Sequence, residues 1–169
     1  RPGLPKETAA QVAAVLRPGN SPAKRGALGL LTRLLQRLRA AFPGVILRVR
    51  LDGGFASPEV LDFLEGEAVA YVVAMASNAR LVKRVRRLLG RARMRSKASG
   101  ETAALFGETR YATRKWRRKR RIVMKAEVVR HPGRDPKNNP RFVITNLAAA
   151  PEAVYQVYRE RGDMENRLK

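Results

Sequence analysis

The sequence predicts an α/β domain whose sheet is at least partly parallel, and two observations in the first half of the chain support this fold class. Apolar runs of strand length alternate with segments in which leucine and valine recur at helical spacing. Pro-Gly and Asp-Gly-Gly turns separate these segments. Because strands that alternate with helices form crossover units, we expect neighbouring strands to pair in parallel.

The elements of the first half follow from apolar periodicity and from helix-capping residues. Ser57 before Pro58 is typical of an N-cap followed by proline in the first helical turn, and Asn78 is a second N-cap. Pro43-Gly44 ends the first helix. Strands are predicted at residues 11–16, 45–51 and 69–76, and helices at residues 21–42, 57–64 and 79–94.

The second half of the chain has a different pattern. Residues 96–100 are small and polar, which predicts a linker. We therefore expect a small antiparallel β-rich element inserted into the α/β domain, followed by a return to helix at Pro151. Its strands, with no helices between them, are predicted at residues 108–113, 121–130 and 141–147, with a turn at residues 131–140.

The charge of the chain points to a polyanionic partner. Its 36 Lys and Arg residues outnumber its 14 Asp and Glu residues, which gives a net charge of +22. Nucleic acid is the usual partner of so basic a chain, and an anionic membrane surface is the weaker alternative. The sequence contains neither an apolar stretch of transmembrane length nor the apolar run of a signal peptide.

The residue types restrict the metal sites that the chain can form. Cysteine is absent, and the one histidine, His131, lies in the predicted turn at residues 131–140. Disulfides, zinc–thiolate sites and clusters of several histidines are therefore excluded. A metal ion would be held by carboxylates, whose hard oxygen atoms favour Mg²⁺ or Mn²⁺.

Two basic tracts contain no acidic residue. The first lies between Glu67 and Glu101, and the second lies between Glu108 and Glu127. Such tracts neutralise phosphates and give strong, salt-sensitive and sequence-independent binding, although a run of charges is usually only a solvated surface. The predicted DNA-binding cations are Arg84, Arg87 and Arg91 in the first tract and Arg114, Lys115, Arg117, Arg118 and Lys119 in the second.

Trp116 lies among the cations of the second tract, and two interpretations of it stay open. An exposed aromatic residue among arginines can stack on an unpaired base. The alternative is an indole that closes the core of the small β-rich element.

The last helix places three polar groups on one face. At about 100° per residue, Tyr158, Arg161 and Glu165 fall within an arc of about 60°. An apolar stripe of valine, methionine and leucine borders this face, so the carboxylate of Glu165 is expected at the edge of the core. The alternative is a solvated Glu165 that pairs with Arg161 or Lys169.

Asp52 directly follows the predicted strand at residues 45–51 and precedes two glycines. Its carboxylate is therefore expected at the carboxyl end of the strand, where ligand sites in open α/β sheets gather. On its own, however, Asp-Gly-Gly is also ordinary turn chemistry.

Together these two motifs resemble those of the DDE transposases of bacterial insertion sequences. The spacing of Tyr158, Arg161 and Glu165 is similar to the YREK signature of one such group, and residues 51–61 are similar to its second aspartate block. The resemblance implies a ribonuclease H-like, or retroviral integrase-like, fold with a mixed sheet. Its parts would be a core at residues 1–95, a β-rich insertion at residues 96–149 and a core helix at residues 150–169.

The same resemblance implies the chemistry of the site. Asp52 and Glu165 would be catalytic metal ligands that hold two Mg²⁺ or Mn²⁺ ions for cleavage of DNA at transposon ends and strand transfer to target DNA. Arg161, supported by Tyr158, would contact a DNA phosphate, and Trp116 would stack on a flipped base. The alternatives are a non-catalytic basic nucleic-acid-binding module and a ribonuclease H-like nuclease.

The resemblance also implies properties of the whole protein. The family's first catalytic aspartate has no counterpart in the sequence, so we expect it before residue 1 and expect this chain alone to be inactive. The full-length protein is expected to act as a homodimer on DNA, without a membrane, in the bacterial cytoplasm at the nucleoid.

Overall fold

The computed structural model describes the backbone of residues 26–167 and the side chains of residues 26–160. The predicted strand at residues 11–16 lies outside this range. In chain order the elements are α1 (Ala27–Ala41), β1 (Arg48–Leu51), the 3₁₀ turn η1 (Gly53–Phe55), α2 (Pro58–Gly66), β2 (Ala70–Met75), α3 (Ala79–Ser99), β3 (Ala103–Tyr111), β4 (Arg120–Val129), β5 (Lys137–Asn138), β6 (Arg141–Thr145) and α4 (Pro151–Arg167).

The strands of the described part of the chain form one mixed sheet. Their order is β1-β2-β6-β4-β3, and the short β5 pairs with β4 outside this order. β1 and β2 are parallel, with Leu51 opposite Val73, whereas β6 is antiparallel to both β2 and β4. The predicted parallel pairing of the strands that flank α2 is therefore confirmed.

The strands that the sequence assigns to a β-rich insertion continue the sheet of the α/β part. β6 lies between β2 and β4, with Thr145 opposite both Val72 and Arg121. Residues 142–145 of β6 are all buried because helices cover both faces of the sheet there, which accounts for their continuous apolar run. The hydrogen-bonded ladder is continuous between the two parts, and the domain boundaries at residues 95 and 149 stay a prediction.

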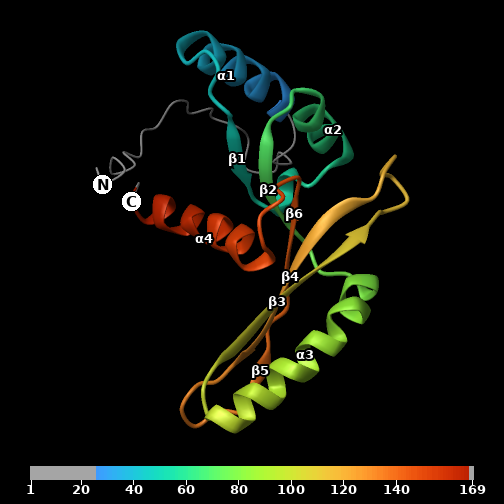
Figure 1. The fold of residues 1–169 in the computed structure, drawn as a ribbon, viewed down its shortest axis with the longest axis vertical. Coiled ribbons are helices and arrows are strands. Elements are labelled where there is room, and N and C mark those ends of the chain that lie inside the picture. Colours follow the sequence, from blue (N-terminus) through green and yellow to red (C-terminus); the bar gives the residue numbers. More distant parts are fainter. Residues whose placement is uncertain (1–25, 168–169) are drawn as a thin grey trace.

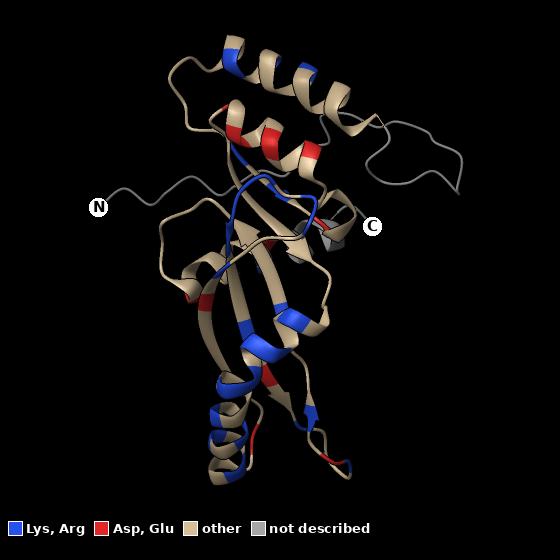
Figure 2. Cartoon of the chain, turned by 90° about the vertical axis from the view of Figure 1, so that its right-hand side faces the viewer, with Lys and Arg blue, Asp and Glu red and all other residues tan. Residues whose placement is uncertain are grey.

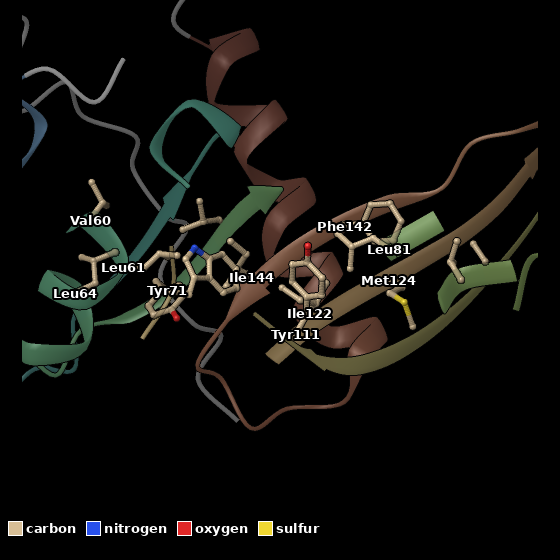
Figure 3. Close-up of a cluster of buried hydrophobic side chains, with 14 of the residues drawn as sticks. Val60, Leu61, Leu64, Tyr71, Leu81, Tyr111, Ile122, Met124, Phe142 and Ile144 are labelled. Atoms are coloured by element: carbon tan, nitrogen blue, oxygen red, sulfur yellow. The ribbon is translucent and has the colours of Figure 1, made fainter. Parts of the chain in front are cut away.

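Helices cover both faces of the sheet, with α2 and α3 on one side and α4 on the other (Figure 1). The smaller core lies under α4, where Val154 and Tyr155 pack on Val72, Val123 and Val143. The larger core lies under α1, α2 and α3, and Figure 3 shows many of its side chains. Its fully buried members include Leu61, Leu64, Tyr71, Leu81, Ile122 and Ile144.

Both predicted N-caps are confirmed. At the start of α2, Ser57 Oγ accepts a hydrogen bond from the Val60 N–H at 3.4 Å. At the start of α3, Asn78 Oδ1 accepts a hydrogen bond from the Leu81 N–H at 3.1 Å. Each bond satisfies a first-turn N–H that has no partner within the helix.

The predicted linker at residues 96–100 is wrong. α3 runs through these residues and ends at Gly100, whose φ of 74° is a left-handed conformation that glycine adopts without strain. The Ser96 side chain is buried, donates a hydrogen bond to the Glu101 carbonyl at 2.7 Å and accepts one from Arg130 Nε at 2.9 Å. The small polar residue is present because helix and sheet pack closely here.

A buried guanidinium joins α2, β2 and the start of β4. Arg120 is 3% exposed. It donates hydrogen bonds to Glu65 from Nε at 2.7 Å and from Nη2 at 2.9 Å, and it donates to Asp62 from Nη2 at 2.5 Å. The Tyr71 hydroxyl donates to Glu65 at 2.7 Å. The guanidinium also lies over the Trp116 ring, 5.2 Å from its centroid, which is a cation–π distance.

These contacts fix the ionisation of the two groups around Arg120. Burial on its own raises the pKa of Glu65, but hydrogen bonds from Arg120 and Tyr71 and the charges of Arg120 and Arg118 outweigh it and lower the pKa. Burial, together with the hydrogen bond to Glu65 and its charge, raises the pKa of the Tyr71 hydroxyl. Glu65 is therefore an anion, and Tyr71 a neutral donor, around neutral pH.

Replacement of Arg120 with methionine should lower the free energy of unfolding by about 3–5 kcal/mol, because Asp62 and Glu65 lose the cation that compensates their burial. Arg117→Met on the neighbouring loop removes an exposed cation and should change it by less than about 0.5 kcal/mol. Urea unfolding measures both variants. Equal losses would show that the network does not stabilise the fold.

Glu65 should also make the stability sensitive to acid. Its folded-state pKa lies below the ordinary value of 4.5, so its contribution is complete above that pH and is lost as the pH falls through the folded pKa. Glu65→Gln should therefore flatten the fall of Tm below a pH of about 4.5, whereas Glu101→Gln, at an exposed position, should not. Parallel curves for the two variants and the wild type would contradict this assignment.

Candidate functional site

Asp52 lies at the carboxyl end of β1, as predicted. It is the N-cap of η1, and its Oδ1 accepts a hydrogen bond from the Gly54 N–H at 2.9 Å. Because β1 and β2 are parallel, their carboxyl ends lie side by side at the same end of the strands. The turn after Asp52 lies close to β2: a Cβ atom at Gly53 would be 3.8 Å from the Ala74 carbonyl oxygen. The Asp52 carboxylate thus lies at the carboxyl end of the strand, where a ligand site is expected, and it also accepts the hydrogen bond that closes the turn after the strand.

α4 is fastened to β1 close to Asp52. Arg50 Nη1 of β1 donates a hydrogen bond to the Val157 carbonyl at 3.2 Å and reaches Glu160 Oε2 at 3.4 Å. Asp52 lies two positions after Arg50, and the backbone between them is extended. The two side chains therefore lie on the same face of the sheet. The face that α4 covers is therefore also the face of Asp52.

Tyr158 lies in the smaller core beside the same edge of the sheet. It is half-buried, and its ring centroid lies 6.0 Å from that of Tyr155. Both rings line a hollow of about 360 Å³ with Arg141 and the end of β2 at residues 74–77. Burial raises the pKa of the Tyr155 hydroxyl. Tyr158 thus packs in the smaller core and lies next to the carboxyl end of β2.

The remaining residues of the predicted catalytic face lie outside the described side chains. Arg161 and Glu165 belong to α4, but only their backbone is described. The resemblance makes Asp52 and Glu165 ligands of the same two metal ions, which requires their carboxylates to lie within about 8 Å of each other, and this stays a prediction. Among the residues whose side chains are described, no three acidic or histidine residues form a group that could hold a metal ion. The carboxylate of Asp52 is nevertheless a hard oxygen ligand of the kind that Mg²⁺ or Mn²⁺ requires.

The first basic tract lies along α3, where lysine and arginine follow the helix (Figure 2). Arg87 and Arg91 are exposed there. Arg84, in contrast, donates hydrogen bonds at 2.5 Å to Thr109 Oγ1 and to the Arg110 carbonyl. This arginine is therefore part of the contact between α3 and β3, and its DNA-binding role stays a prediction.

The middle of the second basic tract, residues 112–119, forms the loop between β3 and β4, which lies beside the acidic residues of α2 (Figure 2). Arg118 pairs with Glu65 at 2.7 Å, and its side chain is still 60% exposed. Arg117 and Lys119 are exposed as well. Arg114 and Lys115 line a largely apolar hollow of about 580 Å³ that also includes Gly53, and this hollow therefore adjoins the Asp52 edge of the sheet.

Of the two interpretations of Trp116, the exposed aromatic is wrong and core packing is confirmed, although the indole packs in the core shared with α2 and α3 rather than in a core of the β-rich element alone. The residue is 8% exposed and belongs to the larger core. Its ring meets Tyr111 edge-on, with centroids 6.0 Å apart and an interplanar angle of 82°. Arg120 occupies a face of the indole, drawn there by Glu65 and Asp62, so that face is closed to a base.

Sequence reasoning missed the network around Arg120, although the alternation in β4 contains a signal for it. Residues 122, 124, 126 and 128 are apolar and buried, and Arg120 continues the same inward-facing set. An inward-facing cation at the end of a strand requires buried acceptors.

No helix within residues 26–167 has the length and apolar character needed to cross a membrane.

Comparison with known protein families identifies the family of the chain. Residues 5–169 match the family described as Transposase DDE domain group 1, and the match includes Asp52, both basic tracts and the whole of α4. A search of curated proteins found no match to the chain. DDE transposases act on DNA and generally use divalent metal ions. Because the match spans nearly the full sequence, the chain belongs to the family of transposase DDE domains, group 1.

Proposed function

We propose that this chain contributes Asp52 and Glu165 to the active site of a transposase of the YREK group, which cuts DNA at the ends of a bacterial insertion sequence and joins it to target DNA. The observation that carries the proposal is the tie between β1 and α4. Arg50 lies two residues before Asp52 and holds α4 at residues 157 and 160. The strand that ends in Asp52 and the helix that contains Glu165 are thereby fastened together on one face of the sheet.

Asp52 and Glu165 are the proposed metal ligands. Two Mg²⁺ or Mn²⁺ ions, when bound, would activate the attacking oxygen and stabilise the leaving oxygen. Asp52 lies in a turn that is held closed by the hydrogen bond from the Gly54 N–H to its own carboxylate, and from this turn it would reach the metal ions. Arg161 is proposed to hold the phosphate that flanks the cleaved bond, with support from Tyr158, whose ring is kept in place by packing against Tyr155.

The DNA path proposed here follows the exposed cations. Arg114 and Lys115 flank the hollow next to Gly53, where they would hold phosphates near the cleavage position. Arg87 and Arg91 on α3 would extend the contact along the duplex. Arg117, Arg118 and Lys119 complete the charged loop and provide further phosphate contacts.

One observation favours a second candidate, a non-catalytic DNA-binding module. The hydrogen bond from the Gly54 N–H gives Asp52 a structural role that is independent of any metal. A module of this kind would bind DNA through the same cations and would cut none. A nuclease with the same site would release cut DNA without joining it to a target, so analysis of the joined products separates the two enzymes.

Removal of either proposed metal ligand should abolish the chemistry and spare DNA binding. Asp52→Asn and Glu165→Gln should each reduce Mg²⁺-dependent nicking and joining by about 100-fold or more, because each removes an anionic ligand. The assay uses the protein as its gene encodes it, with insertion-sequence ends as substrate. DNA affinity measured with Ca²⁺ in place of Mg²⁺ should stay within about twofold of the wild type.

The matched control is Glu152→Gln, which removes an exposed acid from the first turn of α4. It should retain wild-type nicking and joining. Full activity in both Asp52→Asn and Glu165→Gln would rule out the catalytic assignment and leave the DNA-binding module as the better account.

Binding to duplex DNA should be strongly dependent on salt. The net charge of +22 and the exposed cations of the two tracts predict contacts to several phosphates. With about six phosphates neutralised, the affinity should fall by about three orders of magnitude between about 50 and 200 mM salt. Titration of a labelled duplex at several salt concentrations measures the slope. A flat response would contradict phosphate-led binding.

A further inference from the structure

A second concentration of cations lies at the end of the sheet opposite to Asp52. Asp52 follows β1 at the carboxyl end of β2, whereas this region surrounds the amino end of β2 at Tyr71. It is a hollow of about 510 Å³ between the end of α2, the start of β4 and the connection from β6 to α4. Its charged lining residues are Glu65, Glu108, Arg110, Arg118, Lys119, Arg120 and Arg121.

The two carboxylates of this hollow are already matched by other groups. Glu65 accepts hydrogen bonds from Arg120 and Tyr71 and pairs with Arg118. Glu108 accepts a hydrogen bond from Arg121 Nε at 2.8 Å. Five cations thus stand against two carboxylates in the lining, and the carboxylates are occupied.

The side chains of Arg110 and Lys119 are exposed. Neither has a hydrogen-bond or ion-pair partner among the residues that the structure describes. These two cations can therefore bind an external anion without giving up a contact within the fold.

The floor of the hollow is rigid. Arg121 donates hydrogen bonds to the carbonyl groups of Leu147 and Ala149. Asn146 accepts a hydrogen bond from the Tyr71 N–H at 2.9 Å and donates one to the Val69 carbonyl at 2.9 Å. The connection from β6 to α4 is fixed by these bonds, so the positions of the cations around it are set before a ligand arrives.

The lining also limits the chemical class of the ligand. Tyr71 is the aromatic residue of the hollow. It is fully buried and its hydroxyl donates a hydrogen bond to Glu65, so its ring is not accessible to a nucleobase. What the hollow presents is arginine and lysine, which bind phosphate oxygens without regard to base sequence. A backbone phosphate fits this lining, and an exposed base does not.

We propose that this hollow binds a backbone phosphate of duplex DNA through Arg110 and Lys119, with Arg118 beside them. This site is separate from the proposed cleavage site at Asp52. The identity of the ligand as DNA rests on the proposed function, and the location does not. A contact at each end of β2 would hold the duplex at two points and fix its direction across the sheet.

The test compares two double variants of equal charge. Arg110→Gln with Lys119→Gln removes the two proposed contacts, and Arg33→Gln with Arg37→Gln removes two exposed cations of α1. The affinity for a duplex of about 30 base pairs is measured over a range of salt concentrations in Ca²⁺. The first variant should bind about tenfold more weakly and should lose about 2 from the slope of log affinity against log salt. The α1 variant should keep the wild-type slope.

A third variant keeps the test independent of any loss of folding. Glu108→Gln removes a carboxylate from the lining and frees Arg121 from its ion pair, so it should bind the duplex several-fold more tightly. A gain of affinity cannot result from unfolding. Equal weakening in the two double variants, or no gain with Glu108→Gln, would overturn the proposal.

The outcome is distinguishable from failure of the proposed function. If Asp52→Asn leaves the chemistry intact while the Arg110 and Lys119 variant binds weakly, the catalytic assignment fails and the phosphate site stands. If Asp52→Asn is inactive while the Arg110 and Lys119 variant binds like the α1 control, the phosphate site fails alone.

Discussion

The buried guanidinium of Arg120 is the interaction on which the placement of the basic loop depends. It compensates Asp62 and Glu65 on α2 and packs on Trp116, so the loop between β3 and β4 is folded onto the face of the sheet that carries α2 and α3. Because Trp116 is anchored, Arg114 and Lys115 directly before it line the hollow next to Gly53, and Arg118 and Lys119 after it line the hollow at the opposite end of β2. One ion-pair network thereby distributes a single charged tract over two surfaces.

Arginine serves two purposes in this chain, and the structure separates them. Arg50, Arg84 and Arg121 reach across elements to backbone carbonyl groups as well as side chains, which requires the several donors of a planar guanidinium. These residues hold helices and connections on the sheet. Arg87 and Arg91 of α3 and Arg117 and Lys119 of the loop are exposed, make no such contact among the residues whose side chains are described, and can follow a phosphate. The net charge of +22 counts both kinds, so charge alone does not identify the residues that bind DNA.

Sequence rules that act over a few neighbouring residues predicted the helix caps and the strand end at Asp52. Capping chemistry placed Ser57 and Asn78, and the change from an apolar strand to Asp-Gly-Gly placed Asp52 at a strand end. Three features depend on residues far away in the sequence and were not predictable in this way. Trp116 is buried because Arg120 meets Glu65 across 55 positions. Residues 96–99 stay helical because the buried Ser96 side chain bonds to Arg130. β6 inserts between two strands from different halves of the chain. The ribonuclease H-like identity of the fold remains a prediction, because it rests on motifs rather than on this sheet order alone.

The proposed convergence of Asp52 and Glu165 depends on the register of α4 along the sheet. A shift of one residue moves a helical position by about 1.5 Å and turns it by about 100°, which is enough to carry a carboxylate off a shared face. Two contacts oppose such a shift. The bond from Arg50 to the Val157 carbonyl resists sliding, and the packing of Val154 and Tyr155 on the strands resists rotation. Because both contacts lie within the two turns that precede Arg161, the geometry of residues 154–160 determines the direction in which the rest of α4 continues. The proposed active site, assembled from a strand end and a distant helix, requires a constraint of this kind, and Arg50 on β1, two positions before Asp52, supplies one.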